Sequence, residues 1–310
     1  MPGSWPSNTA WQPIPDTFQI NKILGVGASG HVEKVTDTSK GTVYARKHMA
    51  KPKGHNWDKF RSRVLDEFYS MRRVACRHVI NVDFYQEDAE RAMEIYMTPV
   101  ADGNLMDVLE TCVDDSYPVS RIQMIYSWFG CLLKALNFVH SKRVVHKDIK
   151  PPNILVKDNI VYLADFGLSR DFEGGASQSI GPFAGTFEYQ APEFATNQPH
   201  GRATDIFSLG CVFSEMLTVI HKRDLDQFRE LRRTPVPAAL TEMYHAVYSF
   251  HKNLGQVKEW VSELRSNEKD TILVGTIFGM LEVNTSTRMS TAQALERMES
   301  QKELCCTCGL

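Results

Sequence analysis

The most informative segment of the chain reads Val144-Val145-His146-Lys147-Asp148-Ile149-Lys150-Pro151-Pro152-Asn153-Ile154-Leu155. Within it, Asp148 can accept the proton of a substrate hydroxyl, and Lys150 can bring positive charge to a transferring phosphoryl group. Phosphoryl transfer needs in-line positioning and charge neutralisation more than covalent chemistry. The segment therefore indicates a phosphoryl-transfer site.

Two later segments extend this pattern at fixed distances. Leu163-Ala164-Asp165-Phe166-Gly167 places Asp165 twelve residues after Asn153, and Ala191-Pro192-Glu193 places Glu193 28 residues after Asp165. Asn153 and Asp165 offer hard oxygen ligands, which suit Mg²⁺ shared with the phosphates of ATP. Each residue alone could be a helix cap or a turn residue, but coincidence is negligible for all of them in this order.

A glycine-rich loop stands near the N-terminus, in Gly25-Val26-Gly27-Ala28-Ser29-Gly30. Glycines let backbone N–H groups approach an anion closely, because no Cβ atom interferes. Alone, this glycine spacing is weak evidence for a particular nucleotide site. It is more common in the dinucleotide-binding fold, which needs a helix directly after the glycines. Residues 31–36 instead have the composition of a strand. We therefore expect the loop to join two strands and to cover a nucleotide as a flap.

Lys47 follows Gly30 by 17 residues, in a predicted strand over 42–48. Alternate residues of a strand share a face, so Ala45 and Lys47 are expected to point to the same side. There, Ala45 leaves room for a base, and Lys47 offers a point charge to phosphates. A lysine without this context would ordinarily be a solvated surface residue. Glu67, on a helix predicted over 58–74, is the expected partner of Lys47.

With these segments, the chain resembles the eukaryotic protein kinase family from about Thr17 to Arg297. The resemblance implies an α+β, bilobal protein-kinase-like fold that binds ATP between its lobes and uses a protein hydroxyl as acceptor. It implies that Lys47 binds the α- and β-phosphates and pairs with Glu67. It also implies that Asp148 is the catalytic base and that Asn153 and Asp165 hold the metal.

The resemblance assigns further nucleotide contacts. Met97 aligns with the gatekeeper and residues 98–100 with the hinge, whose first and third residues bond adenine through the backbone. Pro99 is the middle residue, so its missing N–H costs no such bond. Val32 and Ala45 are expected to sandwich the base. The implied nucleotide-binding residues are Gly25, Val26, Gly27, Gly30, Val32, Ala45, Lys47, Met97, Thr98, Val100 and Leu155.

Residues outside the nucleotide site fit the family as well. Asp205 resembles the aspartate that anchors the catalytic loop, and Glu193 and Arg288 resemble a buried ion pair below the activation segment. Three residues match the hydrophobic spine that links the lobes: Met71, His146 and Phe166.

The pattern of apolar residues indicates the same architecture. Runs rich in β-branched and aromatic residues predict strands over 18–24, 31–36, 42–48, 79–86 and 92–98. Beyond Leu105 the pattern is mostly helical, as at 122–141, 204–219 and 270–281. We expect an N-terminal linker over 1–16, a small antiparallel β lobe with one helix over 17–98, a hinge and larger, mostly α-helical lobe over 99–300, and a cysteine-containing tail over 301–310. Residues 221–270 are expected to hold inserted structure.

Composition excludes several classes of protein. The chain has 310 residues, with 35 Lys and Arg against 37 Asp and Glu, so its formal net charge is −2. This balance argues against a nucleic-acid binder. The most apolar helical stretch, 206–220, falls short of the ~20 residues that a transmembrane segment needs, and no signal peptide is visible. Four of the seven cysteines are scattered among apolar residues like reduced thiols, so we expect the protein to be cytoplasmic or nuclear.

Two features favour serine and threonine over tyrosine as acceptors in a protein substrate. Lys150 lies two residues after Asp148, and Gly185-Thr186 precedes the Ala191-Pro192-Glu193 segment. Both resemble the Ser/Thr class of the family. Thr186 is expected to touch Asp148 and Lys150 and to orient them.

Activation is expected to depend on phosphorylation by an upstream kinase. Arg63, Lys147 and Arg170 align with family contacts to a phosphate on the activation loop, although Lys147 stands where Arg is usual and cannot make bidentate bonds. Ser177 or Ser179 would carry the phosphate and order the loop. The alternative is that the three basic residues are solvated and that the loop orders unaided.

The expected activity is Mg²⁺-dependent transfer of the γ-phosphoryl group of ATP to Ser or Thr of proteins. A pseudokinase scaffold, which would bind partners without catalysis, is the alternative. Such chains normally lack one of the catalytic or metal-binding residues, and here all are present. Besides Lys147, the departures are Phe187 and Phe207, which replace Pro and Trp and are expected to fill apolar space. Sequence segments such as His146-Lys147-Asp148 resemble those of kinases from filamentous fungi.

Overall fold

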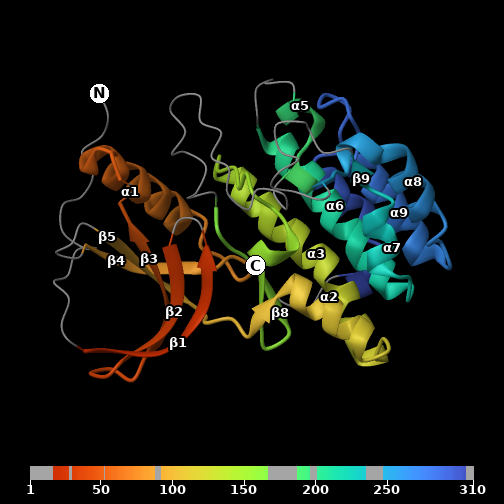
Figure 1. Cartoon of the computed structure of the whole chain (residues 1–310). Helices are drawn as coiled ribbons and strands as arrows, with labels where there is room; N and C mark the ends of the chain where they lie inside the picture. The colour runs from red at the N-terminus through yellow and green to blue at the C-terminus, as the bar shows by residue number, and fades with distance from the viewer. Residues whose placement is uncertain are drawn as a thin grey trace. The chain divides into compact units, whose positions relative to one another are not determined.

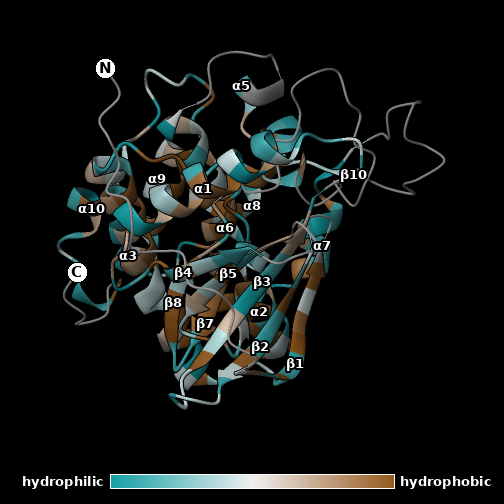
Figure 2. Cartoon of the chain, turned by 90° about the vertical axis from the view of Figure 1, so that its left-hand side faces the viewer, coloured by the Kyte–Doolittle hydropathy of each residue, from teal (hydrophilic) through white to brown (hydrophobic). Residues whose placement is uncertain are grey.

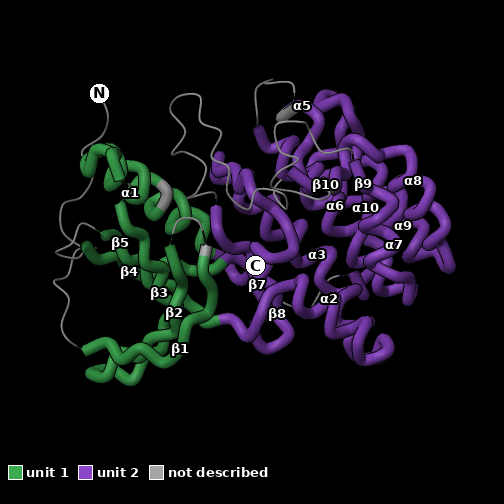
Figure 3. Tube along the Cα trace, viewed as in Figure 1, with its two compact units in different colours: residues 1–75, 80–100, 167–179 green, residues 76–79, 101–166, 180–310 purple. Residues whose placement is uncertain are grey.

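The computed structural model describes residues 17–27, 30–51, 53–87, 92–166, 187–195, 201–234 and 247–304. These residues form two compact units (Figure 3). Residues 17–75 and 80–100 belong to the first unit, and residues 76–79, 101–166 and those from 187 onward belong to the second.

The first unit is built on one antiparallel sheet (Figure 1). Its strand order is β1-β2-β3-β5-β4, and every neighbouring pair is antiparallel. Its elements are β1 (Phe18–Gly27), β2 (Gly30–Asp37), β3 (Val43–Ala50), α1 (Trp57–Arg73), β4 (Asn81–Glu87) and β5 (Ala92–Thr98). The prediction of a small antiparallel sheet accompanied by a helix is confirmed.

The strands of this sheet have two different faces. On β3, Ala45, Lys47 and Met49 are buried and alternate with more exposed neighbours; Val35 on β2 is buried on the opposite face, because it pairs with Tyr44. Figure 2 shows bands of hydrophilic and hydrophobic residues along these strands. The alternation fixes which residues of β3 face the same way, and it therefore fixes the surroundings of Lys47.

α1 begins at an N-cap residue, Asn56, whose side chain accepts a backbone N–H from the first turn. Its buried side chains, Phe60, Val64, Phe68 and Met71, recur every three or four residues and form one apolar stripe. This stripe packs within the first unit, where α1 contacts β4 and β5.

The second unit is mainly helical. Its α-helices are α2 (Leu105–Asp114), α3 (Val119–Ser141), α5 (Pro192–Ala195), α6 (Arg202–Ile220), α7 (Leu225–Glu230), α8 (Leu254–Ser262), α9 (Glu268–Met280) and α10 (Thr291–Met298). Within its described residues, short strands form two small sheets, β6 (Gly103–Asn104) with β7 (Ile154–Lys157) and β8 (Ile160–Leu163), and β9 (Arg233–Thr234) with β10 (Val247–Tyr248). The 3₁₀ helices are η1 (Pro151–Asn153), η3 (His251–Asn253) and η4 (Lys302–Leu304).

α6 is the central helix of the second unit. Every residue from 204 to 220 is buried, and α6 contacts α3, α7, α8 and α9. By length and composition alone, α3 and α6 could each cross a membrane. Of their most apolar windows, however, 56% of α3 and 94% of α6 are buried inside the fold, as in core helices.

Residues 76–79 join the second unit although both of their flanking segments belong to the first. His78 Nδ1 lies 2.8 Å from the carbonyl oxygen of Val161, and Leu163 donates its backbone N–H to the carbonyl of His78 at 2.8 Å. Val79 forms a parallel bridge with Leu163. β8 therefore holds this segment, of which the sequence predicted only Val79 as strand, at the start of the run 79–86.

The predicted elements agree well with the observed ones. The five strands of the first unit and the helix at 58–74 are all present, with ends displaced by a few residues. The helical stretches at 122–141, 204–219 and 270–281 correspond to α3, α6 and α9. The region 221–270 contains α7, β9, β10 and α8. The predicted linker at 1–16, and residues 305–310 of the predicted tail, lie outside the described residues.

Candidate active site

The glycine-rich loop joins β1 to β2, as predicted, and its residues 28–29 lie outside the described part of the chain. Gly27 pairs with Gly30, and Val26 is exposed. Gly30 has a φ of +142°, and a Cβ atom there would collide with the carbonyl oxygen of His48 on β3. A Cβ atom on Gly25 would meet nothing within 4 Å. The sheet therefore requires glycine at 30, whereas Gly25 borders open space.

Lys47 shares one face of the sheet with other predicted nucleotide contacts. The register pairs Lys47 with Val32 on β2 and with Ile95 on β5, and it pairs Ala45 with Met97. Paired residues, and alternate residues of one strand, point to the same side. Val32, Ala45, Lys47 and Met97 therefore share a face, which confirms the prediction for residues 45 and 47. Ala45 and Lys47 are each 8% exposed.

The opposite face of β3 carries an ion-pair network. Arg46 Nη2 donates to Glu33 Oε2 at 2.6 Å, and Nη1 lies 3.5 Å from Glu94 Oε1. Burial raises the pKa of Glu33, but the hydrogen bond and charge of Arg46 outweigh burial and lower it. Arg46 is therefore turned away from the face of Lys47 and ties three strands together.

The predicted hinge follows β5. Thr98 donates its hydroxyl to Asp83 Oδ2 at 2.8 Å, which joins the end of β5 to β4. The Thr98–Pro99 peptide bond is cis, and Val100 is the last residue of the first unit in this part of the chain. Leu155, another predicted nucleotide contact, belongs to the second unit, where it lies on β7 and pairs with Tyr162.

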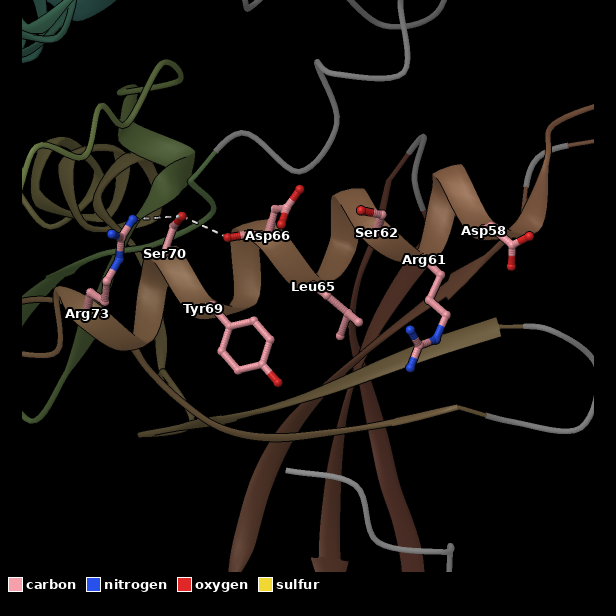
Figure 4. Close-up of a pocket in the computed structure, with 8 residues that line it drawn as sticks. All are labelled: Asp58, Arg61, Ser62, Leu65, Asp66, Tyr69, Ser70 and Arg73. Carbon is pink, nitrogen blue, oxygen red and sulfur yellow. Dashed lines mark hydrogen bonds between the residues drawn. The ribbon is translucent and has the colours of Figure 1, made fainter. Parts of the chain in front are cut away.

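α1 carries two predicted site residues, Arg63 and Glu67. The side chain of Glu67 lies outside the described parts of the structure, so its pairing with Lys47 stays a prediction. One face of α1 borders a cavity of about 420 Å³ (Figure 4), lined by Asp58, Arg61, Ser62, Leu65, Asp66, Tyr69, Ser70 and Arg73. On this face, Arg61 Nε donates to Glu87 of β4 at 2.6 Å.

Asp148 is the centre of the candidate active site in the second unit. Lys150 Nζ donates to Asp148 Oδ2 at 2.8 Å, and Asn153 Nδ2 donates to the same oxygen at 2.8 Å. Asn153 Nδ2 also donates to the backbone carbonyl of Asp148 at 2.8 Å. Three of the predicted residues therefore meet at one carboxylate, and the two donors stabilise its negative charge.

A buried carboxylate on α6 holds this loop in place. Asp205, 1% exposed, accepts the backbone N–H groups of His146 and Lys147 at 2.8 Å each, one on each oxygen. Nε2 of His140 on α3 lies 2.9 Å from Asp205 Oδ2. The prediction that Asp205 anchors the catalytic loop is confirmed. The contact of His140 was not predicted, because nothing in a single sequence marks a helical histidine as the partner of a residue on another helix.

The backbone around Asp148 adopts conformations that are rare for residues other than glycine. Lys147 has a φ of +70° and Asp165 a φ of +60°, and such strain gathers at functional sites. The ring of His146, which is fully buried, lies 4.4 Å from the ring of Phe166. Burial lowers the pKa of His146, so the neutral ring accepts the backbone N–H of Asp148 on Nδ1 at 3.3 Å.

Asn153 and Asp165 fit a Mg²⁺ ion by the chemistry of their donor atoms. Asn153 makes two side-chain hydrogen bonds, both through its nitrogen, which directs the amide oxygen away from Asp148. Ala164, the neighbour of Asp165, donates its N–H to the carbonyl of Asn153 at 3.0 Å. Within the described residues, no three His, Cys, Asp or Glu side chains gather into a metal site. Two protein ligands suffice for Mg²⁺, which takes its other ligands from water and substrate phosphates.

The predicted ion pair of Glu193 and Arg288 is present and buried. Arg288 donates from Nη1 and Nη2 to the two carboxylate oxygens of Glu193, at 2.6 and 2.9 Å. Burial raises the pKa of Glu193, but the hydrogen bonds of Arg288 outweigh burial and lower it. Arg288 also donates to the carbonyls of Ala203, Glu282 and Val283, so this pair fastens three segments to one another.

The remaining predictions from the sequence have mixed outcomes. Four predicted site residues fall outside the described residues: Arg170, Ser177, Ser179 and Thr186. Phe207 fills buried space on α6, as predicted. The prediction for Phe187 was wrong, since its side chain is 42% exposed. Sequence reasoning also missed a buried cluster of Arg232 with Glu188 and Glu215, because no motif distinguishes these residues from solvated charges.

The sequence of the chain matches a known protein family and several known proteins. The family described as protein kinase domain matches residues 18–298. The chain is 26% identical to mitogen-activated protein kinase p38b of Drosophila melanogaster, over 96% of the chain and 82% of that protein. It is 32% identical to serine/threonine-protein kinase crk1 of Schizosaccharomyces pombe, over 61% of the chain and 58% of that protein.

Other relatives are much longer than this chain. It is 23% identical to cyclin-dependent kinase-like 5 of Mus musculus, over 94% of the chain but 31% of that protein. It is 30% identical to serine/threonine-protein kinase TIO of Arabidopsis thaliana, over 65% of the chain and 14% of that protein. The chain therefore spans less than a third of the length of these two relatives.

Proposed function

Since the chain belongs to the protein kinase domain family over residues 18–298, we propose that it is a serine/threonine kinase that transfers the γ-phosphoryl group of ATP to protein substrates. One observation carries the proposal. The Asp148 carboxylate holds Lys150 and Asn153 at 2.8 Å each, on a loop that Asp205 anchors. This arrangement supplies a base, a cation and an orienting amide at one place.

Asp148 accepts the proton of the substrate hydroxyl while the hydroxyl oxygen forms its bond to the γ-phosphorus of ATP; the bond from that phosphorus to the β-phosphate oxygen breaks, and ADP leaves. Asn153 fixes the orientation of the carboxylate, which keeps the base in line with the acceptor. Proton transfer neutralises Asp148 and weakens its attraction for Lys150. The Lys150 ammonium group is then released toward the negative charge on the transferring phosphoryl oxygens.

Asn153 and Asp165 are the residues that would hold Mg²⁺. When bound, the ion neutralises charge on the phosphates of ATP. In the first unit, Lys47 supplies positive charge for the α- and β-phosphates. Val32, Ala45 and Met97, on the same face of the sheet, supply an apolar surface that suits a base.

Serine and threonine are the proposed acceptors. Lys150 stands two residues after the proposed base, as in the Ser/Thr class of the family. Two relatives are named serine/threonine-protein kinases, at 30% and 32% identity. We propose the same acceptor class here, and phosphoamino-acid analysis of a labelled substrate tests it.

The decisive experiment is transfer of labelled γ-phosphate from Mg-ATP to a mixed basic protein substrate, with wild type and Asp148→Asn compared. Label on Ser and Thr that collapses in Asp148→Asn would support the proposal. The matched control is Asp158→Asn, the same change at an exposed aspartate in the turn between β7 and β8. Asp158 has a φ of +49°, which Asn also tolerates, so this variant should keep wild-type activity.

A pseudokinase scaffold would give a different result. Wild type and Asp148→Asn would then transfer no label even with Ser177 or Ser179 phosphorylated, while both proteins remained folded. Equal label in both proteins would point to a contaminating kinase and would remove the support for Asp148 as the base.

A further inference from the structure

We propose that Arg232 is a positioning residue that fixes residues 187–190 for engagement of the protein substrate. The inference rests on the proposed function. Residues 187–190 directly follow Gly185-Thr186, and Thr186 is the residue expected to orient Asp148 and Lys150. Arg232 lies between α7 and β9, in the region that the sequence marked only as inserted structure.

The guanidinium group of Arg232 joins three separate segments. Nη1 donates to Glu215 Oε1 of α6 at 3.1 Å, and Nη2 lies 3.2 Å from Glu188 Oε1. Nε donates to the carbonyl of Phe228 on α7 at 3.2 Å. The side chain is buried, with 1% of its residue surface exposed. Each nitrogen of the guanidinium therefore has a partner in a different segment.

Two aromatic rings hold the plane of this group. Its carbon lies 3.9 Å from the ring centroid of Phe250 and 4.6 Å from that of Phe228. An arginine can stack on rings while its flat fork reaches two carboxylates, and a lysine cannot. The site is therefore specific for arginine, not only for positive charge.

The backbone of Arg232 organises a second set of contacts. Ser249 donates its N–H to the carbonyl of Arg232 at 3.0 Å, and Asn253 Nδ2 donates to the same carbonyl at 2.9 Å. Asn253 Nδ2 also donates to the carbonyl of Ser249 at 2.9 Å. Arg232 thus holds residues 249–253 from its backbone while its side chain holds Glu188.

Residues 249–253 in turn bind residues 187–190. Phe250 donates its N–H to the carbonyl of Glu188 at 3.0 Å, and His251 Nδ1 lies 3.1 Å from the carbonyl oxygen of Gln190. Ser208 of α6 donates its hydroxyl to the carbonyl between them, that of Tyr189, at 2.8 Å. Three consecutive carbonyls, of residues 188, 189 and 190, are therefore fixed by the β10–η3 region and by α6.

Charge balance makes this network sensitive to substitution. One cation, Arg232, serves two buried carboxylates, and Tyr189 donates its hydroxyl to Glu215 at 2.9 Å. Removal of the cation takes from both buried carboxylates the ion-pair partner that they share, which could unfold the unit and so would not test positioning. The informative change is Arg232→Lys, which keeps the charge and loses the fork and the stacking.

The test compares full-length wild type, Arg232→Lys and Arg223→Lys. Arg223 is a matched control: it also pairs with a glutamate, Glu263 at 3.3 Å, and stacks on a ring, Trp260 at 4.3 Å, but its side chain is 39% exposed. Initial rates are measured with ATP and a protein substrate varied in turn. Hydrogen exchange is measured on the peptide that spans 187–191.

We expect Arg232→Lys to lower kcat/KM for the protein substrate by about tenfold or more, since a charged hydrogen bond is lost. The KM for ATP should stay within about twofold of wild type, because only one substrate loses its site. Exchange of residues 187–191 should accelerate in Arg232→Lys and not in Arg223→Lys. Unchanged kcat/KM, an equal effect on both substrates, or unchanged exchange would each overturn the inference.

The two proposals fail in different ways. A wild type that transfers no phosphate, even with Ser177 or Ser179 phosphorylated, would overturn the proposed function. Hydrogen exchange needs no activity, so it still decides whether Arg232 fixes 187–190 in such a protein.

Discussion

The carboxylate of Asp205 accepts the backbone N–H of Lys147 at 2.8 Å, although 58 residues separate the two in the chain. Its second oxygen accepts the N–H of His146 at 2.8 Å. Helix α6 therefore sets the conformation of the loop that carries Asp148, including the positive φ of Lys147. The loop is held from outside by a buried charge, and its geometry depends on that charge.

Replacing Asp205 should damage both stability and activity. Asp205→Asn turns an NH₂ group toward a backbone N–H, and that N–H then has no acceptor. We therefore expect a loss of about 1–3 kcal/mol in the free energy of unfolding. Phosphoryl transfer by the folded variant should fall by about tenfold or more. Urea denaturation and initial rates measure the two effects. Asp226→Asn, at an exposed position of α7, is the control, and equal stability of the two variants would contradict the prediction.

The buried pair of Glu193 and Arg288 should contribute far more to stability than an exposed pair. Arg288→Met strands the Glu193 carboxylate in the interior, and we expect a cost of about 3–5 kcal/mol. Arg233→Met breaks an exposed pair, whose N–O distance to Glu230 is 3.7 Å, and should cost about 0–1 kcal/mol. Denaturant unfolding compares the variants. The prediction fails if the two losses are alike.

Asp270 should make the protein sensitive to acid. Burial raises the pKa of its carboxyl, but the imidazole of His221, 3.2 Å away, and hydrogen bonds from Ser266 and Tyr126 outweigh burial and lower the pKa from 3.8 to about 2. A lowered pKa in the folded state gives stability that is present above the unfolded value and is lost as the pH falls through about 2. The amount is about 2 kcal/mol.

The measurement is the free energy of unfolding of wild type and Asp270→Asn as the pH falls from about 5 to about 2. Wild type should lose about 2 kcal/mol more than the variant over this range. Parallel curves for the two proteins would show that Asp270 does not carry the effect.

The two glycines of the loop should respond differently to the same change. Gly30→Ala forces a Cβ atom into the carbonyl of His48 at a φ of +142°, so it should destabilise the first unit by about 1–3 kcal/mol. Gly25→Ala meets no protein atom and should leave thermal unfolding unchanged, while it raises the KM for ATP by filling the phosphate space. Thermal unfolding measures the loss of stability in Gly30→Ala, and initial rates at varied ATP measure the change of KM in Gly25→Ala. A KM that Gly25→Ala leaves unchanged would argue against phosphate binding there.

Control by phosphorylation is the remaining prediction from the sequence. Ser177 and Ser179 lie outside the described residues. If a phosphate on either serine orders the loop, phosphatase treatment should lower wild-type activity, and the double variant Ser177→Ala with Ser179→Ala should start low and respond no further. Unchanged activity and unchanged phosphatase sensitivity in the double variant would refute the idea.

Much of the fold and of the catalytic loop could be predicted because the relevant signals are local. The strand runs and the helix pattern at 58–74 depend on neighbours in sequence, and so does the spacing of Asp148, Lys150 and Asn153. Their meeting at one carboxylate is local, because Asn153 follows Asp148 by only five positions. Asp205 could be placed only through the family resemblance.

The parts that could not be predicted depend on contacts between distant residues. His140 meets Asp205 across 65 positions, and Arg232 meets Glu215 across 17 and Glu188 across a longer gap. A buried arginine and a solvated one look identical in a single sequence, because burial is decided by what folds over them. The prediction that Phe187 fills apolar space failed for the same reason, since an apolar residue type does not reveal whether the fold leaves buried space for it.

The pairing of residues 76–79 with β8 limits how this chain can be cut into fragments. A fragment that ended at Val100 would contain 76–79 without β8, so His78 would lose its bonds to Val161 and Leu163. Such a fragment would leave backbone groups at His78 and Val79 without their partners on β8 and open to pairing with another molecule. Chimeras that exchange the first unit between relatives should therefore transplant β8 together with it, or keep residues 76–79 from the recipient.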